Sequence, residues 1–307
     1  MTYFLGIDGG GTKTTCAVGD ESRLLVTATA GPSNIVRVGG ARARESLHKC
    51  VAQACAAAGI TPEQISRTCA GGSGAARPEL GEAVRGFLAE ILSSPIDVVG
   101  DMEIALEAAF EEGPGVIVIA GTGSIAYGRD RPGKTVRAGG WGFAIGDEGS
   151  AHWIGRSAVS AVLRESDRLP DGTGPTVLAQ ALFRVWGVNS LIDLARAANS
   201  IPPPDFAALS PAVISVSDAV AEQVLTSAGR ELALVAEVVI RRLFPNQETD
   251  DVPVAMTGGV FRHAALVRQV FYNELRQFDG RARVNPNVVE PVEGALRMAR
   301  RAARKPA

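Results

Sequence analysis

The chain has 307 residues, of which 46% are hydrophobic and 21% charged, a composition that is ordinary for a globular protein and excludes general disorder. Its 31 basic residues nearly balance its 33 acidic residues, for a net charge of −2, so we expect neither a nucleic-acid partner nor an anionic membrane partner. No apolar run reaches membrane-spanning length, and the N-terminus enters a predicted strand without a leader segment, so we expect a cytoplasmic protein.

Residues 4–18 predict a strand, a glycine-rich turn and a second strand. Asp8 ends the first apolar run and could hold a magnesium ion through its water shell. The turn offers unobstructed amides, hydroxyls and one ammonium group, a combination that suits phosphate; these donors are on Gly9, Gly10, Gly11, Thr12, Lys13 and Thr14. The spacing excludes a P-loop and a dinucleotide fingerprint, because a strand and not a helix follows. A plain hairpin turn with glycines at positive φ is the simpler alternative.

Strands and helices then alternate, which predicts an α/β sheet. A third strand is expected at 24–29, followed by a turn that contains Asn34. The elements expected after this turn are a helix at 41–58, a strand at 67–70, a glycine-rich loop at 71–74, a helix at 78–92, a strand at 96–99 and a helix at 102–110.

Asp101 stands between the last of these strands and the helix that follows it. Aspartate is a favoured helix N-cap, worth about 1 kcal/mol, and this would explain the residue without any function. Ligands of open α/β sheets, however, bind outside the carboxyl ends of the strands, where a carboxylate can accept a proton from a substrate hydroxyl. Both interpretations stay open at this point.

A second strand, Gly/Thr turn and strand occupies residues 116–127, with Gly121, Thr122, Gly123 and Ser124 in the turn. The recurrence predicts two related α/β halves that each present a turn to a shared ligand. A second glycine-rich stretch, 139–149, carries Trp141 and Asp147 and suggests backbone close to a small ligand. Trp141 could equally be a core residue, and Asp147 could simply begin the helix expected at 151–163.

The rest of the chain is mostly helical from 176 to 244, and then predicts a strand at 252–256, a turn at Gly258 and Gly259, and helices at 263–275 and 292–303. All four cysteines lie within the first 69 residues in apolar patterns typical of buried free thiols. The three histidines have no metal-ligand spacing. We therefore expect no zinc site.

Residues 8–14 and 121–124 resemble the two phosphate motifs of the actin, heat-shock-chaperone and sugar-kinase superfamily, and residues 254–260 resemble its adenosine motif. The resemblance implies two actin-like (ribonuclease H-like) α/β domains with an ATP and sugar cleft between them. The domains implied are 1–112, completed by a C-terminal helix within 288–307, and 113–287 with its helical layer.

Within this superfamily, residues 139–151, 285–287 and 291–296 resemble N-acetylglucosamine kinases and the wider BadF/BadG/BcrA/BcrD ATPase family. The resemblance implies Asp101 as the catalytic residue and Gly258 and Gly259 as adenosine-binding. It also implies a set of sugar-binding residues: Asn34, Asp101, Ser124, Gly140, Trp141, Asp147 and Ala151.

The reaction expected is direct in-line phosphoryl transfer from ATP, with Mg²⁺, to the 6-hydroxyl of an amino sugar, N-acetyl-D-glucosamine above the others, with Asp101 as general base. The alternatives are a glucosamine kinase, or a non-kinase ATPase or sugar-sensing regulator of the same family. N-acetylmannosamine and muramic derivatives stay open as substrates, and so does a homodimer.

Overall fold

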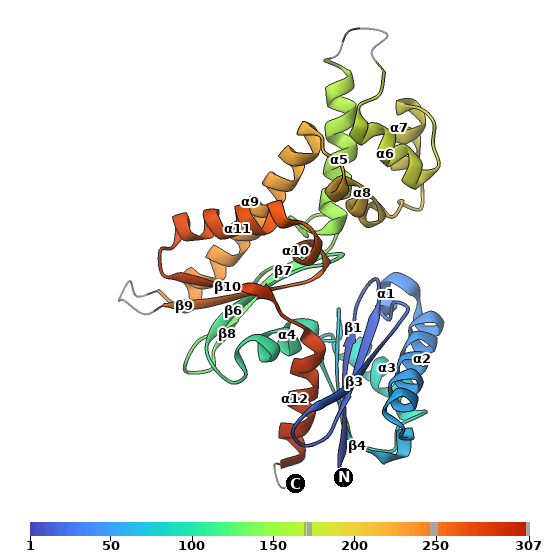
Figure 1. Cartoon of the computed structure of the whole chain (residues 1–307), viewed down its shortest axis with the longest axis vertical. Helices are drawn as coiled ribbons and strands as arrows, with labels where there is room; N and C mark the ends of the chain where they lie inside the picture. Colours follow the sequence, from blue (N-terminus) through green and yellow to red (C-terminus); the bar gives the residue numbers. More distant parts are fainter. Residues whose placement is uncertain (169, 171–173, 246–250, 305–307) are drawn as a thin grey trace. The chain divides into compact units, whose positions relative to one another are not determined.

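The computed structural model describes residues 1–168, 170, 174–245 and 251–304, and it divides into two compact units. The first contains Met1–Gly113 and Val289–Ala307, and the second contains Pro114–Val288. Residues 305–307 of the segment expected to complete the first domain lie outside the described residues. The chain therefore leaves the first unit once and returns to it with its C-terminal helix (Figure 1).

The first unit is built on a five-stranded sheet in the order β3-β2-β1-β4-β5. β1 pairs antiparallel with β2 and parallel with β4, and β4 pairs parallel with β5. The strands are β1 (Tyr3–Gly9), β2 (Thr14–Gly19), β3 (Leu24–Ala30), β4 (Ile65–Gly72) and β5 (Ile96–Gly100). Because β1, β4 and β5 run in the same direction, their carboxyl ends meet at one edge of the sheet.

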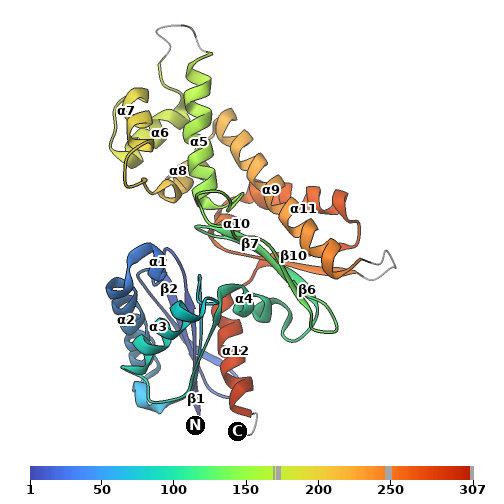
Figure 2. The same cartoon turned by 180° about the vertical axis from the view of Figure 1, so that it is seen from behind.

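Helices cover both faces of this sheet (Figures 1 and 2). One face packs on α2 (Gly40–Ala58) and α3 (Pro78–Ala89), and the other on α4 (Asp101–Phe110) and α12 (Pro291–Arg304). Adjacent residues of β1 point to opposite faces of the sheet, because side chains alternate along a strand. Leu5 packs in the core with α2 and α3, and Phe4 packs in the core with α4 and α12. The short helices α1 (Ile35–Val38) and η1 (Pro62–Gln64) lie in the connections.

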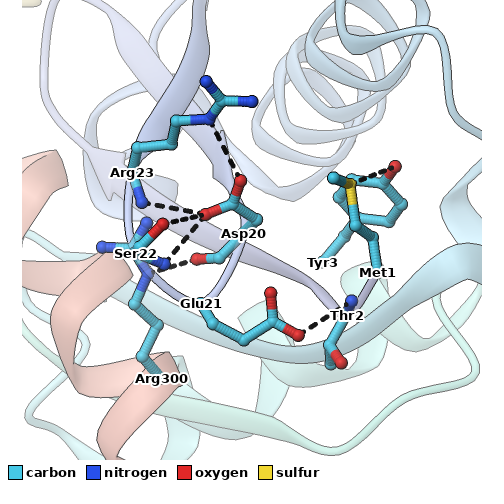
Figure 3. Close-up of polar contacts among 8 residues, drawn as sticks. All are labelled: Met1, Thr2, Tyr3, Asp20, Glu21, Ser22, Arg23 and Arg300. Carbon is cyan, nitrogen blue, oxygen red and sulfur yellow. Dashed lines mark hydrogen bonds and ion pairs between the residues drawn. The ribbon is translucent and has the colours of Figure 1, made fainter.

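The C-terminal helix α12 is held to the first unit by close packing and by ion pairs. A Cβ on Gly6 of β1 would lie 2.5 Å from the backbone nitrogen of Leu296, so glycine is needed for this approach. Both terminal guanidinium nitrogens of Arg301 donate to the buried carboxylate of Glu107 on α4, at 2.6 and 2.9 Å. Arg300 donates to the carbonyl oxygen of Asp20 at 2.7 Å, beside the β2–β3 turn that the Asp20 carboxylate organises (Figure 3).

The second unit repeats the strand order of the first, as β10-β9-β6-β7-β8. β6 pairs antiparallel with β7 and parallel with β9, as β1 does with β2 and β4. The strands are β6 (Gly115–Ala120), β7 (Ser124–Arg129), β8 (Thr135–Gly139), β9 (Val252–Thr257) and β10 (Ala282–Val288). The predicted two-unit α/β architecture with a repeated hairpin is thus confirmed.

One face of the second sheet packs on the long helix α9 (Ala219–Leu243), which lies beside α11 (Ala265–Phe278). Asp218 caps α9 by accepting from the backbone nitrogens of Val220 and Ala221, which stabilises the helix N-terminus. The remaining helices are α5 (Ala151–Ser166), α6 (Val177–Trp186), α7 (Leu191–Ala198), η2 (Phe206–Leu209), α8 (Ser210–Ser215) and α10 (Gly259–His263).

Two strands were not expected from the sequence. β8 is half-exposed and polar, and β10 is an edge strand whose pairing with β9 shifts register between Val284 and Val288. Pro286 is tolerated there because an edge strand leaves one side of its backbone unpaired. The helix expected at 263–275 is α11, which begins at Ala265, and the short helix α10 before it was not expected.

All four cysteines are free and buried, as expected. Among the described residues, no single helix is long and apolar enough to cross a membrane, although two bent helix pairs meet that test by length and composition.

Candidate functional site

The first glycine-rich turn joins β1 to β2 and is attached to the loop that follows β3. The Gly10 backbone nitrogen donates to the carbonyl of Lys13 at 2.9 Å and closes the turn. The Gly10 carbonyl accepts from the backbone nitrogens of Ser33 and Asn34 at 3.2 and 3.3 Å. The turn therefore holds the segment that carries Asn34.

Asn34 itself is a helix cap and not simply a turn residue. Its side-chain oxygen accepts from the Arg37 backbone nitrogen at 3.3 Å and begins the short helix α1. Because the cap uses the oxygen of the amide and not its NH₂ group, the side chain keeps donors for a ligand.

Asp8 lies at the carboxyl end of β1, one residue before the turn. Loss of hydration, together with the charges of Asp101 and Glu290, raises its pKa to about 7, and the charge of Lys13 opposes this shift. Carboxylates that repel one another in a dehydrated site favour a divalent cation, so these residues fit Mg²⁺. The described residues contain no group of three or more His, Cys, Asp or Glu that could enclose a metal.

Asp101 is the first residue of α4, and the interpretation of it as the N-cap is wrong. Gly100 is the cap residue, and its backbone nitrogen donates to the side chain of Glu103 at 3.0 Å. The two carboxylate oxygens of Asp101 accept from the backbone nitrogen of Met102 at 3.0 Å and from the hydroxyl of Ser73 at 2.7 Å. The carboxylate is thus held at the sheet edge where β1, β4 and β5 end.

Ser73 was not singled out in the sequence, although it lies in the expected glycine-rich loop. A small hollow in the first unit has Gly9, Ser33, Gly72 and Ser73 among its lining residues, together with apolar side chains of α2 and α3. The position of Ser73 in the sequence could have identified it. Ser73 follows β4 as Asp101 follows β5, and the carboxyl ends of neighbouring parallel strands lie close together.

The second glycine-rich turn joins β6 to β7 and is attached to the start of helix α5. The backbone nitrogen of Gly121 donates to the carbonyl of Gly123 at 2.9 Å and closes the turn. The carbonyls of Gly121 and Thr122 accept from the backbone nitrogens of Ala151 and His152 at 2.9 and 3.2 Å. The structure therefore brings Ala151 next to the predicted phosphate turn.

The loop that precedes α5 packs against the same turn. The Ser124 hydroxyl donates to the carbonyl of Glu148 at 2.6 Å, and a Cβ on Gly123 would lie 2.8 Å from a carboxylate oxygen of Asp147. Burial raises the pKa of Asp147, against the opposing effect of hydrogen bonds from the backbone of Gly142 and Ser124. Asp147 has φ of +60°, and Ser150, not Asp147, caps α5, so the helix-start interpretation of Asp147 is wrong.

Trp141 is not a core residue, because 68% of its surface is exposed. The guanidinium of Arg137 lies 4.7 Å from the centroid of its ring, a distance typical of a cation–π contact. The neighbouring Gly140 has φ of +67° and packs on Ile125 at the start of β7. The loop thus presents an indole ring, which can pack on an apolar sugar face, from the residues that follow β8.

Gly258 and Gly259 follow β9 and lie against the second turn. Gly258 has φ of +104°, and a Cβ there would lie 2.3 Å from the carbonyl oxygen of Ala120, so only glycine fits. A Cβ on Gly259 would meet nothing within 4 Å, which leaves its backbone open for a flat ligand group to approach. The predicted phosphate and adenosine segments of the second unit are therefore in contact.

Comparisons with known proteins agree over almost the whole chain. Residues 5–299 match the model of the BadF/BadG/BcrA/BcrD ATPase family. The chain is 32% identical to the N-acetylmuramic acid/N-acetylglucosamine kinase of Clostridium acetobutylicum over 91% of this chain and 90% of that protein. It is 27% identical to the N-acetyl-D-glucosamine kinase of Dictyostelium discoideum over 96% of this chain and 97% of that protein. A Chromobacterium violaceum structure solved as a candidate N-acetylglucosamine kinase matches with a TM-score of 0.75 and 26% identity, over 97% of this chain and 99% of that one.

Proposed function

Because the chain belongs to the BadF/BadG/BcrA/BcrD ATPase family, we propose that it is an ATP-dependent kinase that phosphorylates the 6-hydroxyl of an amino sugar, N-acetyl-D-glucosamine above the others. The observation that carries the proposal is the Asp101 carboxylate, which lies at the carboxyl edge of the first sheet and does not belong to the N-cap residue of α4. The three relatives named above carry names of amino-sugar kinases, which supports the same substrate class.

In the first unit, Asp101 accepts the proton of the sugar hydroxyl as its oxygen attacks the γ-phosphorus of ATP, the bond from that phosphorus to the bridging oxygen breaks, and ADP leaves. A positioned general base of this kind contributes about 10²–10⁴ in rate. Asn34 donates to the sugar, and Gly9, Gly10, Gly11, Thr12 and Lys13 donate to phosphate. Asp8 would hold Mg²⁺, and the chemistry that the ion would supply is neutralisation of phosphate charge.

In the second unit, Gly121, Thr122 and Gly123 donate to phosphate, and Gly258 and Gly259 pack on adenosine. The sugar-binding residues proposed here are Ser124, Gly140, Trp141, Asp147 and Ala151. Asp147 accepts hydrogen bonds from sugar hydroxyls, and Trp141 covers an apolar face of the ring. The support for this group is that Ser124, Asp147 and Ala151 all lie around the second turn.

The test is an ADP-release assay with ATP and Mg²⁺ on wild type and Asp101→Asn. The sugar panel contains glucose, glucosamine, N-acetylglucosamine, N-acetylmannosamine and N-acetylmuramic acid. We expect the highest kcat/KM with N-acetylglucosamine, and its loss in the variant. A preference for glucosamine would replace the acetylated substrate with the free amine. Nucleotide binding without turnover of any sugar would overturn the kinase and favour a sugar-sensing ATPase.

A further inference from the structure

Ser73 connects the first glycine-rich turn to the carboxylate of Asp101. Its backbone nitrogen donates to the carbonyl of Gly9 at 3.1 Å, and its hydroxyl donates to Asp101 at 2.7 Å. Gly9 is the last residue of β1, and Asp101 is the first of α4. One residue therefore bridges the segment proposed to bind phosphate and the proposed general base.

The packing of α4 on β4 brings these groups within reach of each other. The side chain of Ile104 lies directly on the backbone of β4, so that a Cβ on Gly71 would lie 2.3 Å from it. Glycine at this position lets the first turn of α4 approach the end of β4 closely. The loop that carries Ser73 starts two residues after Gly71, beside Asp101.

The hydrogen bond is of the strong kind, because a hydroxyl donates to a carboxylate. Ser73 holds one oxygen of Asp101, and the backbone of Met102 holds the other. With both oxygens held, the carboxylate cannot rotate freely, and each oxygen keeps a lone pair that can accept a proton. A small misplacement of a catalytic group costs a large part of its rate contribution.

We propose that Ser73 is a positioning residue, which holds Asp101 in the orientation that proton transfer from the sugar hydroxyl requires. The inference rests on the proposed function, and it assigns to Ser73 no contact with sugar or nucleotide. Its effect on the reaction passes entirely through Asp101.

Replacement of Ser73 by alanine isolates this role, because the backbone bond to Gly9 does not involve the side chain. We expect Ser73→Ala to lower kcat with N-acetylglucosamine about 10-fold. The KM values for ATP and sugar should stay within about twofold of wild type, since no binding contact is removed. Ser73→Thr keeps the hydroxyl and should restore most of kcat.

Two further variants separate positioning from general structural damage. Ser94→Ala is the matched control: the Ser94 hydroxyl is also buried in the first unit, but it has no hydrogen-bond partner among the described residues, and kcat should stay at the wild-type value. In an Asp101→Asn background, Ser73→Ala should change the residual rate by less than about twofold, because residues that act as a unit are not additive.

The outcomes distinguish this inference from the proposed function. If the wild type turns over sugar and Ser73→Ala keeps the wild-type kcat, the Ser73 inference fails and the kinase stands. A loss of rate that is equally large with and without Asp101 also overturns it, because Ser73 would then act elsewhere. If the wild type phosphorylates no sugar, both fail together.

Discussion

The two glycine-rich turns of this protein occupy the same place in two sheets of the same strand order, yet different groups surround them. Around the first turn lie the ionisable side chains Asp8, Lys13 and Asp101, with Ser73 between turn and carboxylate. The second turn is attached to the N-terminus of α5 and lies against Gly258, with Asp147 beside it. A repeated topology can therefore be retained while the residues at the strand ends diverge.

The difference predicts that the residues of the two units have different roles in the proposed reaction. In the first unit, loss of hydration and the neighbouring Asp101 carboxylate raise the pKa of Asp8, as is common in sites that move protons or hold metal ions. In the second unit, backbone hydrogen bonds, the bare Gly258 and the buried carboxylate of Asp147 surround the turn, and the roles proposed for them are in ligand binding and not in proton transfer. We therefore expect substitutions in the first unit to change mainly kcat, and substitutions in the second to change mainly affinity.

The largest effect expected is on catalysis, at Asp101. Asp101→Asn keeps the size of the side chain but removes the proton acceptor, so kcat should fall by about 10²–10⁴. Affinity for N-acetylglucosamine, measured by calorimetry, should change little. Asp147→Asn is the matched change in the second unit, and we expect it to raise KM for the sugar about 10-fold or more while kcat falls less. Equal losses of kcat in the two variants would contradict the assignment of catalysis to the first unit and of affinity to the second.

A second effect is expected on stability, at the ion pair that fixes α12 to α4. Glu107 is 3% exposed, so Glu107→Gln leaves Arg301 without its bidentate partner. Because Arg301 remains about a third exposed, we expect a loss of about 2 kcal/mol, less than for a fully buried pair. Urea unfolding measures it.

The control for this change is Glu274→Gln in the second unit, where the partner Arg230 is mostly exposed. That substitution should cost under about 1 kcal/mol. If both variants lose the same stability, the attachment of α12 contributes no more than a surface contact.

A third effect is expected on nucleotide affinity, at Gly258. Gly258→Ala forces a Cβ against the carbonyl of Ala120 at a positive φ, so the turn must shift, and KM for ATP should rise about 10-fold. Gly86→Ala in α3 is the control, because its Cβ would meet nothing within 4 Å and alanine favours a helix by about 1 kcal/mol. An unchanged KM for ATP in Gly258→Ala would count against a nucleotide role for this segment.

The smallest effect expected is the pH dependence of stability at Asp147. Burial raises its pKa in the folded protein, so the folded state binds a proton more readily than the unfolded state. The charged carboxylate then lowers stability progressively as pH rises above the ordinary aspartate pKa of about 3.9. Asp147→Asn should therefore raise the melting temperature at pH 7, and the gain should shrink as pH falls toward 4. A gain that is the same at both pH values would contradict this assignment.

Much of the fold could be predicted from the sequence because its signals are local. The turns at 9–13 and 121–123 are marked by glycines between apolar runs, and α2 by its apolar spacing and by Gly59, which ends it at φ of +68°. The strands β8 and β10 carry no such pattern of apolar residues. They are the two edge strands of the second sheet, and partly exposed edge strands need few apolar residues.

The site was predicted less completely, because its contacts join distant parts of the chain. The sequence by itself determined the two hairpins, the alternation of strands and helices and the acidic residues at strand ends, since each follows from neighbouring residues. Only the tertiary structure decided that Gly100 and not Asp101 caps α4, that Ser73 reaches Asp101 across 28 positions, and that Trp141 is exposed while Asp147 is buried. These depend on which strand ends become neighbours and on which side chains lose water, and no local pattern encodes either.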